Sequence, residues 1–326
     1  MAGIRFLAAP FRTDQPLVLV LLVPVIALLW WQQPAVPLSI ADQGGMPLYM
    51  AVVGRSAPWP WLHGVLGLLA VAWLAPLLAS TANNAELFDR RNRMPAILIL
   101  LIMGLVKGPL LSPALCGALP LLFALRRAWA IQGRNDVFGA LFGAGMLIGI
   151  AALFYMPYAF MVVALWAAVS VMRPFDWRDY AMPLAGAMLT FYFCWGILRL
   201  AGQPPMQPIA AILNAAHPSF PVGKPMILAF VGLVPMLAFG VLGYVRSYQK
   251  TIMRERNSRL AFLALCWALL AVIALEVIVH GKFPVVLIAL PLAVVITYPF
   301  LVTKRGWLAE VALFALLAIG CAVQWG

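Results

Sequence analysis

Three ionisable residues stand out because they lie within or between apolar segments, where a charged group is costly and often functional. Glu276 and His280 stand four residues apart at the end of one apolar run, so a helix would place both on one face. Asp42 is the carboxylate of the Pro-rich segment 33–60. A carboxylate beside a membrane can take the proton of a sugar or acyl acceptor. Asp42, Glu276 and His280 are therefore the candidate catalytic residues.

Six further residues fit the recognition of a phosphate. A phosphate or diphosphate on a lipid carrier needs several cations at headgroup level, and Arg and Lys supply them. The candidate phosphate-binding residues are Arg55, Lys107, Arg199, His217, Lys224 and Lys282. Lys and Arg at helix ends also extend to lipid phosphates in any membrane protein, so a plain anchoring role stays open.

The composition indicates which elements must position these groups. The chain has 326 residues, of which 65% are hydrophobic and 10% charged. Soluble domains carry about 25% charged residues, so we predict a membrane protein. No connector is long enough for a soluble domain, and we expect one integral membrane domain over residues 1–326.

We predict an all-α, polytopic transmembrane helical bundle with about 11 spans, each near the ~20 residues that a bilayer core requires. The predicted spans are 16–32, 61–82, 95–108, 112–129, 137–155, 157–172, 181–200, 223–245, 260–280, 284–302 and 307–324. Lys107, Gly108, Pro109 and Pro113 interrupt the third and fourth spans. These two can form a re-entrant pair instead, which leaves nine spans and the same orientation elsewhere.

The positive charges fix the expected orientation. Of the 22 Lys and Arg residues, seventeen fall in alternate connectors, which the positive-inside rule places in the cytoplasm. The exceptions are Arg55, Lys107, Arg199, Lys224 and Lys282. We therefore expect a bacterial inner-membrane protein with its N-terminus in the cytoplasm, its C-terminus outside, and the candidate site at the outer face.

Several other functions are disfavoured. The net charge of +12 matches cytoplasmic connectors of a membrane protein, so we expect no nucleic-acid partner. The chain contains no GxxxxGKS phosphate loop, no HExxH and no Cys/His ligand cluster. We therefore expect no metal and no cofactor. The expected partners are membrane lipids, including a polyprenyl-phosphate carrier.

Three further patterns have mainly structural interpretations. The predicted span 137–155 carries Gly139, Gly143, Gly145 and Gly149 at GxxxG spacings, which suit close packing with a neighbouring helix or with a membrane-protein partner. The segment NNAELFDRRNR, residues 83–93, is expected to be a charged connector, with nucleotide or headgroup binding as the alternative. RPFDWRDY, residues 173–180, is expected to form a turn stiffened by local ion pairs.

The stretches RRNRMPAILILLIM, LSPALCGALPLLFAL, FGAGMLIGIAALFYMPYAF and RPFDWRDY carry a family resemblance. Over residues 84–200 the chain resembles an uncharacterised family of multi-pass inner-membrane proteins from Bacteroidota, a domain of unknown function. That resemblance implies a membrane fold and no particular activity.

The layout more distantly resembles the GT-C glycosyltransferases. Those enzymes begin in the cytoplasm, place a catalytic carboxylate in the loop after the first span, and use polyprenyl-phosphate-linked donors on the outer face. Asp42 stands at the matching position, although Gln43 follows it where such enzymes commonly have a second acidic residue. The large external C-terminal domain that many of them carry is also absent from this sequence.

The leading hypothesis is thus a GT-C-like glycosyltransferase of envelope glycan assembly. Asp42 would be the general base, Lys107, Arg199 and Lys224 would hold the phosphate, and Glu276 and His280 would orient donor or acceptor. One alternative is a transporter or flippase of an anionic lipid or envelope precursor, suggested by the interruptions at Lys107–Pro113 and Tyr155–Pro157. Another is a non-catalytic subunit or scaffold of an envelope complex, suggested by the glycine spacing.

Overall fold

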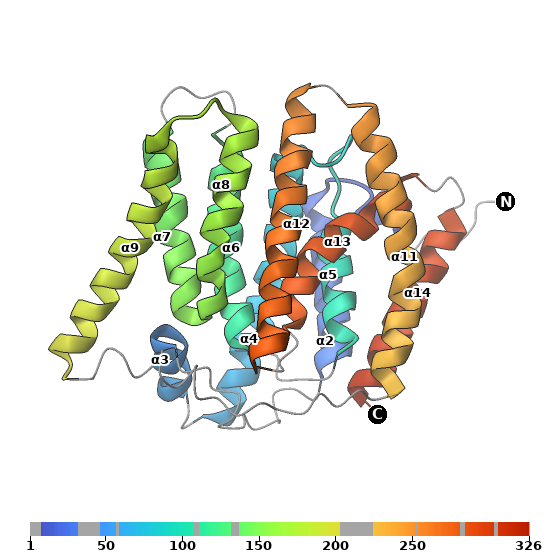
Figure 1. Ribbon diagram of the computed structural model, residues 1–326. Coiled ribbons are helices and arrows are strands. Elements are labelled where there is room, and N and C mark those ends of the chain that lie inside the picture. Colours follow the sequence, from blue (N-terminus) through green and yellow to red (C-terminus); the bar gives the residue numbers. More distant parts are fainter. Residues whose placement is uncertain are drawn as a thin grey trace.

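The computed structural model describes residues 8–31, 46–56, 59–106, 111–131, 137–202, 224–251, 253–280, 284–302 and 306–325. Within these ranges all regular secondary structure is helical (Figure 1). The elements are α1 (Ala8–Phe11), η1 (Pro16–Leu21), α2 (Leu22–Trp30), α3 (Pro47–Ser56), α4 (Pro60–Asn84), α5 (Met94–Gly104), α6 (Pro113–Trp129), α7 (Phe138–Phe154), η4 (Met156–Phe160), α8 (Met161–Met172), α9 (Trp177–Leu200), α11 (Lys224–Gln249), α12 (Met253–His280), α13 (Val285–Val302) and α14 (Gly306–Trp325).

The helices are long and apolar, as expected of a membrane protein. Among the described residues, five stretches are long and apolar enough to cross a bilayer. They are Trp61–Asn84, Trp177–Leu200, Glu255–Ile278, Val285–Val302 and Trp307–Trp325. Shorter apolar helical stretches cover Pro16–Trp30, Met94–Gly104, Phe138–Phe154 and Met156–Met172. The all-α membrane class is thus confirmed, while the count of about 11 spans and the orientation of the termini stay predictions.

Prolines help to set where several helices begin. Pro60, Pro95 and Pro113 stand in the first turns of α4, α5 and α6. A proline is favourable there because its missing N–H would have no partner in the helix and its φ is already helical. Ser112 adds a cap to α6, since its Oγ accepts a hydrogen bond from the Leu115 N–H at 3.2 Å.

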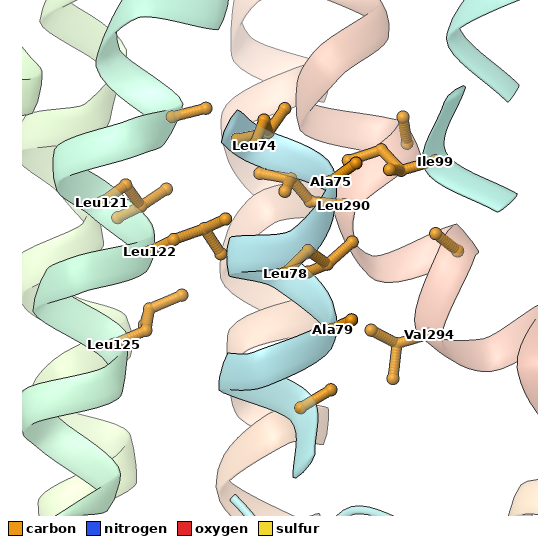
Figure 2. Packing of buried hydrophobic residues seen from close by; sticks show 14 of the residues in the cluster. Leu74, Ala75, Leu78, Ala79, Ile99, Leu121, Leu122, Leu125, Leu290 and Val294 are labelled. Atoms are coloured by element: carbon orange, nitrogen blue, oxygen red, sulfur yellow. The ribbon is translucent and has the colours of Figure 1, made fainter. Parts of the chain in front are cut away.

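The core lies where α4 meets α5 and α6, beside α13, which contacts α5 and α6 (Figure 2). Leu74 and Leu78 of α4 pack beside Leu121 of α6 and Leu290 of α13, and all four side chains are buried. The short helix α5 is buried along its whole length and contacts α2, α4, α13 and α14. Its 11 residues extend only about 16 Å, roughly half of the ~30 Å hydrocarbon core.

Helices α7 and α9 approach each other through reciprocal glycines. A Cβ on Gly145 would lie 2.0 Å from the Pro183 carbonyl oxygen, and a Cβ on Gly186 would lie 2.2 Å from the Phe142 carbonyl oxygen. Any side chain at either position would force the two backbones apart. The expectation that the glycine spacing packs helices closely is therefore confirmed for α7 and α9.

The other glycines of α7 differ in their surroundings. A Cβ on Gly143 would lie 2.1 Å from the Arg127 guanidinium of α6, so this glycine also faces a helix of the same chain. Gly139 has nothing within 4 Å of its Cβ position. A partner protein that docks on these glycines stays a proposal. Among the described residues, only Gly139 of the four glycines has no neighbour from this chain at its Cβ position.

Candidate functional site

The bundle has two ends that differ in chemistry. We call the end that holds α3 and the last turn of α12 the α3 end, and the end that holds residues 85–93 and the first turn of α12 the basic end (Figure 1). By the positive-inside expectation, the basic end faces the cytoplasm and the α3 end faces outward.

Glu276 is a buried carboxylate at the α3 end. Its residue is only 4% exposed, although α12 around it is otherwise apolar. Its Oε1 accepts a hydrogen bond of 2.7 Å from the Tyr155 hydroxyl, 121 positions away in sequence. A buried carboxylate needs hydrogen-bond donors because the transfer of an unpaired charge out of water is strongly unfavourable. Tyr155 supplies one such donor.

Tyr155 is held in place by the turn between α7 and η4. It ends α7 in an extended conformation, with φ −148° and ψ 102°, and a 3-10 helix begins directly after it. Its ring contacts Tyr158 edge to face, with centroids 5.4 Å apart. The Tyr158 hydroxyl in turn donates 2.8 Å to the Ala114 carbonyl of α6, and Gly117 leaves room for the Tyr158 ring. The donor to Glu276 is thus fixed by contacts reaching α6.

The interruption at Tyr155–Pro157 is the turn between two neighbouring helices rather than a break within one helix. α7 and α8 lie next to each other in Figure 1, joined by η4 at their lower ends. Pro157 stands in the first turn of η4, where a proline favours the start of a helix. This turn places a polar tyrosine opposite α12 at the level of Glu276.

A second polar pair at the α3 end joins α3 to α4. Ser56 Oγ and His63 Nε2 lie 2.8 Å apart, and both residues are buried, at 2% and 8% exposure. The Ser56 hydroxyl also lies 2.8 Å from the Val52 carbonyl oxygen of its own helix. Tyr49 anchors the same helix by donating 3.0 Å to the Leu111 carbonyl. These bonds hold α3 against the bundle.

Sequence reasoning did not single out Ser56, His63 or the hydroxyl of Tyr155. Tyr155 carried no usable signal, because its contact with Glu276 joins residues far apart in the chain. Ser56 and His63 did carry a weak signal: two polar residues seven positions apart, on either side of the proline that begins α4.

The candidate residues from the sequence have different outcomes. Asp42, Lys107, His217 and Lys282 lie outside the described residues. Lys224 begins α11 and His280 ends α12, but their side chains are also outside the described set. Glu276 is buried, whereas Arg55 in α3 and Arg199 in α9 are exposed.

The helix ends that carry two of the candidate cations are far apart across the bundle. Arg199 stands in the last turn of α9, and Lys224 is the first residue of α11. In Figure 1 these ends lie at the lower left and the lower right, with the last turn of α12 between them. The described backbone does not bring these two positions together around Glu276.

The basic end contains a network that the sequence did not reveal. Arg259 has an exposed fraction of 0%, and its guanidinium donates to Asp89 Oδ1 at 2.8 Å, Ser247 Oγ at 2.7 Å and Thr251 Oγ1 at 2.6 Å. The Tyr244 hydroxyl donates to the Arg259 carbonyl. This residue looked like one more connector cation, but it ties the α11–α12 hairpin to residues 85–93.

Residues 83–93 form an ordered connector. The Asn83 side chain bonds both the carbonyl and the N–H of Asn92, at 2.8 Å and 3.2 Å. Arg93 pairs with Asp14 at 2.8 Å, and the Tyr298 hydroxyl donates to the Leu87 carbonyl. These contacts favour the connector interpretation of this segment over ligand binding.

The turn at residues 173–180 has the expected local ion pairing. Arg173 lies 3.3 Å from the buried Asp179 carboxylate. Asp176 caps α9 by accepting from the Arg178 N–H at 3.0 Å. The structural interpretation of this turn is confirmed.

No group of three His, Cys, Asp or Glu residues in the described part of the chain is arranged to hold a metal ion. Comparison with protein families, with curated proteins and with solved structures finds no match to this chain. Function is therefore inferred from the residues themselves.

Proposed function

We propose that this protein is an integral membrane transferase that moves a sugar or related group from a polyprenyl-phosphate-linked donor to an acceptor at the outer face of the inner membrane. The single observation that carries the proposal is the buried Glu276, placed at the α3 end and bonded by Tyr155. An ionisable residue within an apolar span is a functional candidate, and Glu276 lies at the end of the bundle where the acceptor is expected.

Each group has a chemical role in this proposal. The Glu276 carboxylate, or Asp42, takes the proton of the acceptor hydroxyl as that oxygen attacks the donor carbon. Tyr155 holds the Glu276 carboxylate in one orientation by hydrogen bonding to Oε1. Cations at headgroup level neutralise the phosphate that leaves. His280 lies one helical turn beyond Glu276 and orients donor or acceptor.

The chain offers a matched control for Glu276. Glu310 of α14 is also a buried carboxylate, 6% exposed, and its Oε1 accepts 2.8 Å from the Ala8 N–H at the basic end. Both residues are therefore carboxylates in apolar helices with a described hydrogen-bond donor. They differ in which end of the bundle they occupy.

The test replaces each carboxylate by its amide in a strain in which deletion of the gene alters an envelope glycan. We expect Glu276→Gln to lower glycan formation by about 100-fold or more, as for loss of a general base. Glu310→Gln should retain it, and both proteins should be present at wild-type levels. Asp42→Asn asks whether Asp42 shares the role. Full restoration of the glycan by both Glu276→Gln and Asp42→Asn would overturn the proposal.

A transporter of an anionic lipid or envelope precursor is the second candidate, and the short helix α5 favours it. α5 is buried on all sides, spans only about half of a bilayer, and ends at Gly104. Discontinuous helices of this kind mark substrate sites in many transporters. Purified protein in vesicles would then move a labelled polyprenyl-phosphate-linked sugar across the bilayer unchanged, whereas the transferase would modify it.

A further inference from the structure

An apolar groove lies between η4–α8 and α9, on the side of the bundle away from α12. Its volume is about 250 Å³. Phe160 is 53% exposed and Val163 is 54% exposed on one wall, while Met188 is 61% exposed on the other. The remaining lining is also apolar and includes Trp166, Leu184 and Phe191.

α9 continues this wall with an exposed stripe. Met188, Tyr192, Trp195 and Arg199 stand at positions i, i+4, i+7 and i+11, which share one face of a helix. Tyr192 is 64% and Trp195 is 48% exposed. Their rings stack with centroids 6.3 Å apart. The stripe therefore leads from the groove, past two aromatic rings, to an exposed cation about 16 Å further along the helix.

The opposite face of α9 is already occupied. Gly186 and Thr190 pack against α7, where Gly145 and Gly149 allow the close approach. The face that carries the stripe thus points away from the α7 contact.

The groove has room for one chain. A cavity of about 150 Å³ binds benzene, with its six carbons, so about 250 Å³ holds a hydrocarbon segment of roughly ten carbons. That volume matches about two isoprene units of a single lipid chain. The guanidinium of Arg199 suits a phosphate because it donates several hydrogen bonds from a fixed plane. Aromatic residues such as Trp195 prefer the level between chain and headgroup.

We propose that the groove and the α9 stripe bind the single chain of a polyprenyl phosphate, with Arg199 at its phosphate. The inference rests on the proposed function for the choice of a polyprenyl carrier. The inference also adds a second site to the proposed function, because the last turn of α9 lies well away from the last turn of α12 in Figure 1. The surface docks the lipid from the bilayer and lies apart from the reacting atoms at Glu276.

The test is photo-crosslinking of the purified protein with a diazirine-bearing polyprenyl phosphate, followed by mapping of the adducts. We expect adducts on the peptides that contain Phe160 and Met188 and not on the peptide that contains Phe239, an equally lipid-facing residue of α11 that is 66% exposed. Unlabelled polyprenyl phosphate should compete, and phosphatidylglycerol, which has two chains, should not. Equal labelling of Phe239, or equal competition by phosphatidylglycerol, would overturn the inference.

Two pairs of variants sharpen this test. Val163→Trp should fill the groove and reduce labelling at least fivefold, whereas Val241→Trp on the lipid-facing side of α11 should leave it unchanged. Arg199→Gln should weaken competition by unlabelled polyprenyl phosphate about tenfold, with competition by polyprenol unaffected. Unchanged labelling in Val163→Trp, or unchanged phosphate dependence in Arg199→Gln, would contradict the proposed site.

The outcome is separable from that of the proposed function. Glu276→Gln should keep selective labelling even where glycan formation is lost. Selective labelling together with full glycan formation in Glu276→Gln and Asp42→Asn would leave the lipid surface standing and remove the catalytic proposal. Glycan loss in Glu276→Gln without selective labelling would leave the catalytic proposal standing and remove the lipid-binding surface.

Discussion

Each end of α12 contains one buried ionisable side chain, and the two side chains have different surroundings. At the basic end, the buried Arg259 guanidinium donates to Ser247 of α11, to Thr251 just after α11 and to Asp89. At the α3 end, Glu276 meets the hydroxyl of Tyr155, which stands at a turn beside η4. The first arrangement joins three segments of chain through one side chain, and this is what a structural role requires. The second places a carboxylate in an apolar span, and the proposed transferase uses this carboxylate as a proton acceptor.

The largest expected effect breaks the basic end. Arg259→Ala removes the buried guanidinium with its three hydrogen bonds and leaves a cavity. We therefore expect a loss of about 3 kcal/mol in the free energy of unfolding. This corresponds to a fall in Tm of roughly 6 °C in detergent. Arg256→Ala is the matched control, because Arg256 is an exposed arginine of the same helix that contacts Tyr248. Equal melting of the two variants would show that the network has no structural role.

An intermediate effect is expected where Tyr155 meets Glu276. Tyr155→Phe keeps the ring but removes the hydroxyl, and the Oε1 atom of a buried carboxylate then loses a donor. We expect a loss of about 1–2 kcal/mol in the free energy of unfolding together with reduced glycan formation. Tyr180→Phe removes a hydroxyl from a half-buried ring in the first turn of α9, away from Glu276 and outside the α9 stripe, and should change neither quantity. A Tyr155→Phe protein with normal glycan formation would argue that Glu276 does not need to be oriented.

The smallest effect concerns the exposed partner of the Arg259 network. The Asp89 side chain is 75% exposed although its Oδ1 lies 2.8 Å from Arg259. Asp89→Asn keeps an acceptor and removes a charge that water already screens, so we expect a loss of at most about 1 kcal/mol. The difference in Tm between the wild type and Asp89→Asn should become smaller at high salt, because salt weakens exposed ion pairs. A loss as large as that of Arg259→Ala would show that the charge of Asp89, and not burial of the arginine, holds this end together.

Much of the fold was predictable because the bilayer imposes strong rules. Long apolar runs must be helical in lipid, since every backbone N–H and C=O needs an internal partner. α9, α12, α13 and α14 therefore appear close to their predicted ranges. After residue 94 the sequence is compatible with two spans or a re-entrant pair, and there the structure has the short buried α5 followed by α6.

The candidate site was predictable only in part. Glu276 stood out because a carboxylate within an apolar run is rare. Its donor did not, since a tyrosine 121 positions away has no special spacing. The sequence also carried no signal of the groove between α8 and α9 or of the α9 stripe that leads from it to Arg199. Every residue that lines the groove is an ordinary apolar residue of a membrane helix.

The amino-acid sequence by itself determined that this chain is helical, and that it is apolar enough and low enough in charge to lie in a membrane. These features follow from hydrophobicity and charge, which each residue has regardless of its neighbours. The tertiary structure alone decided that Arg259 is buried, that Tyr155 meets Glu276, and that Met188 and Arg199 lie on the free face of α9. The physical reason is that burial and hydrogen bonding depend on contacts between helices, and nearly identical apolar helices carry no local signal of which faces will meet.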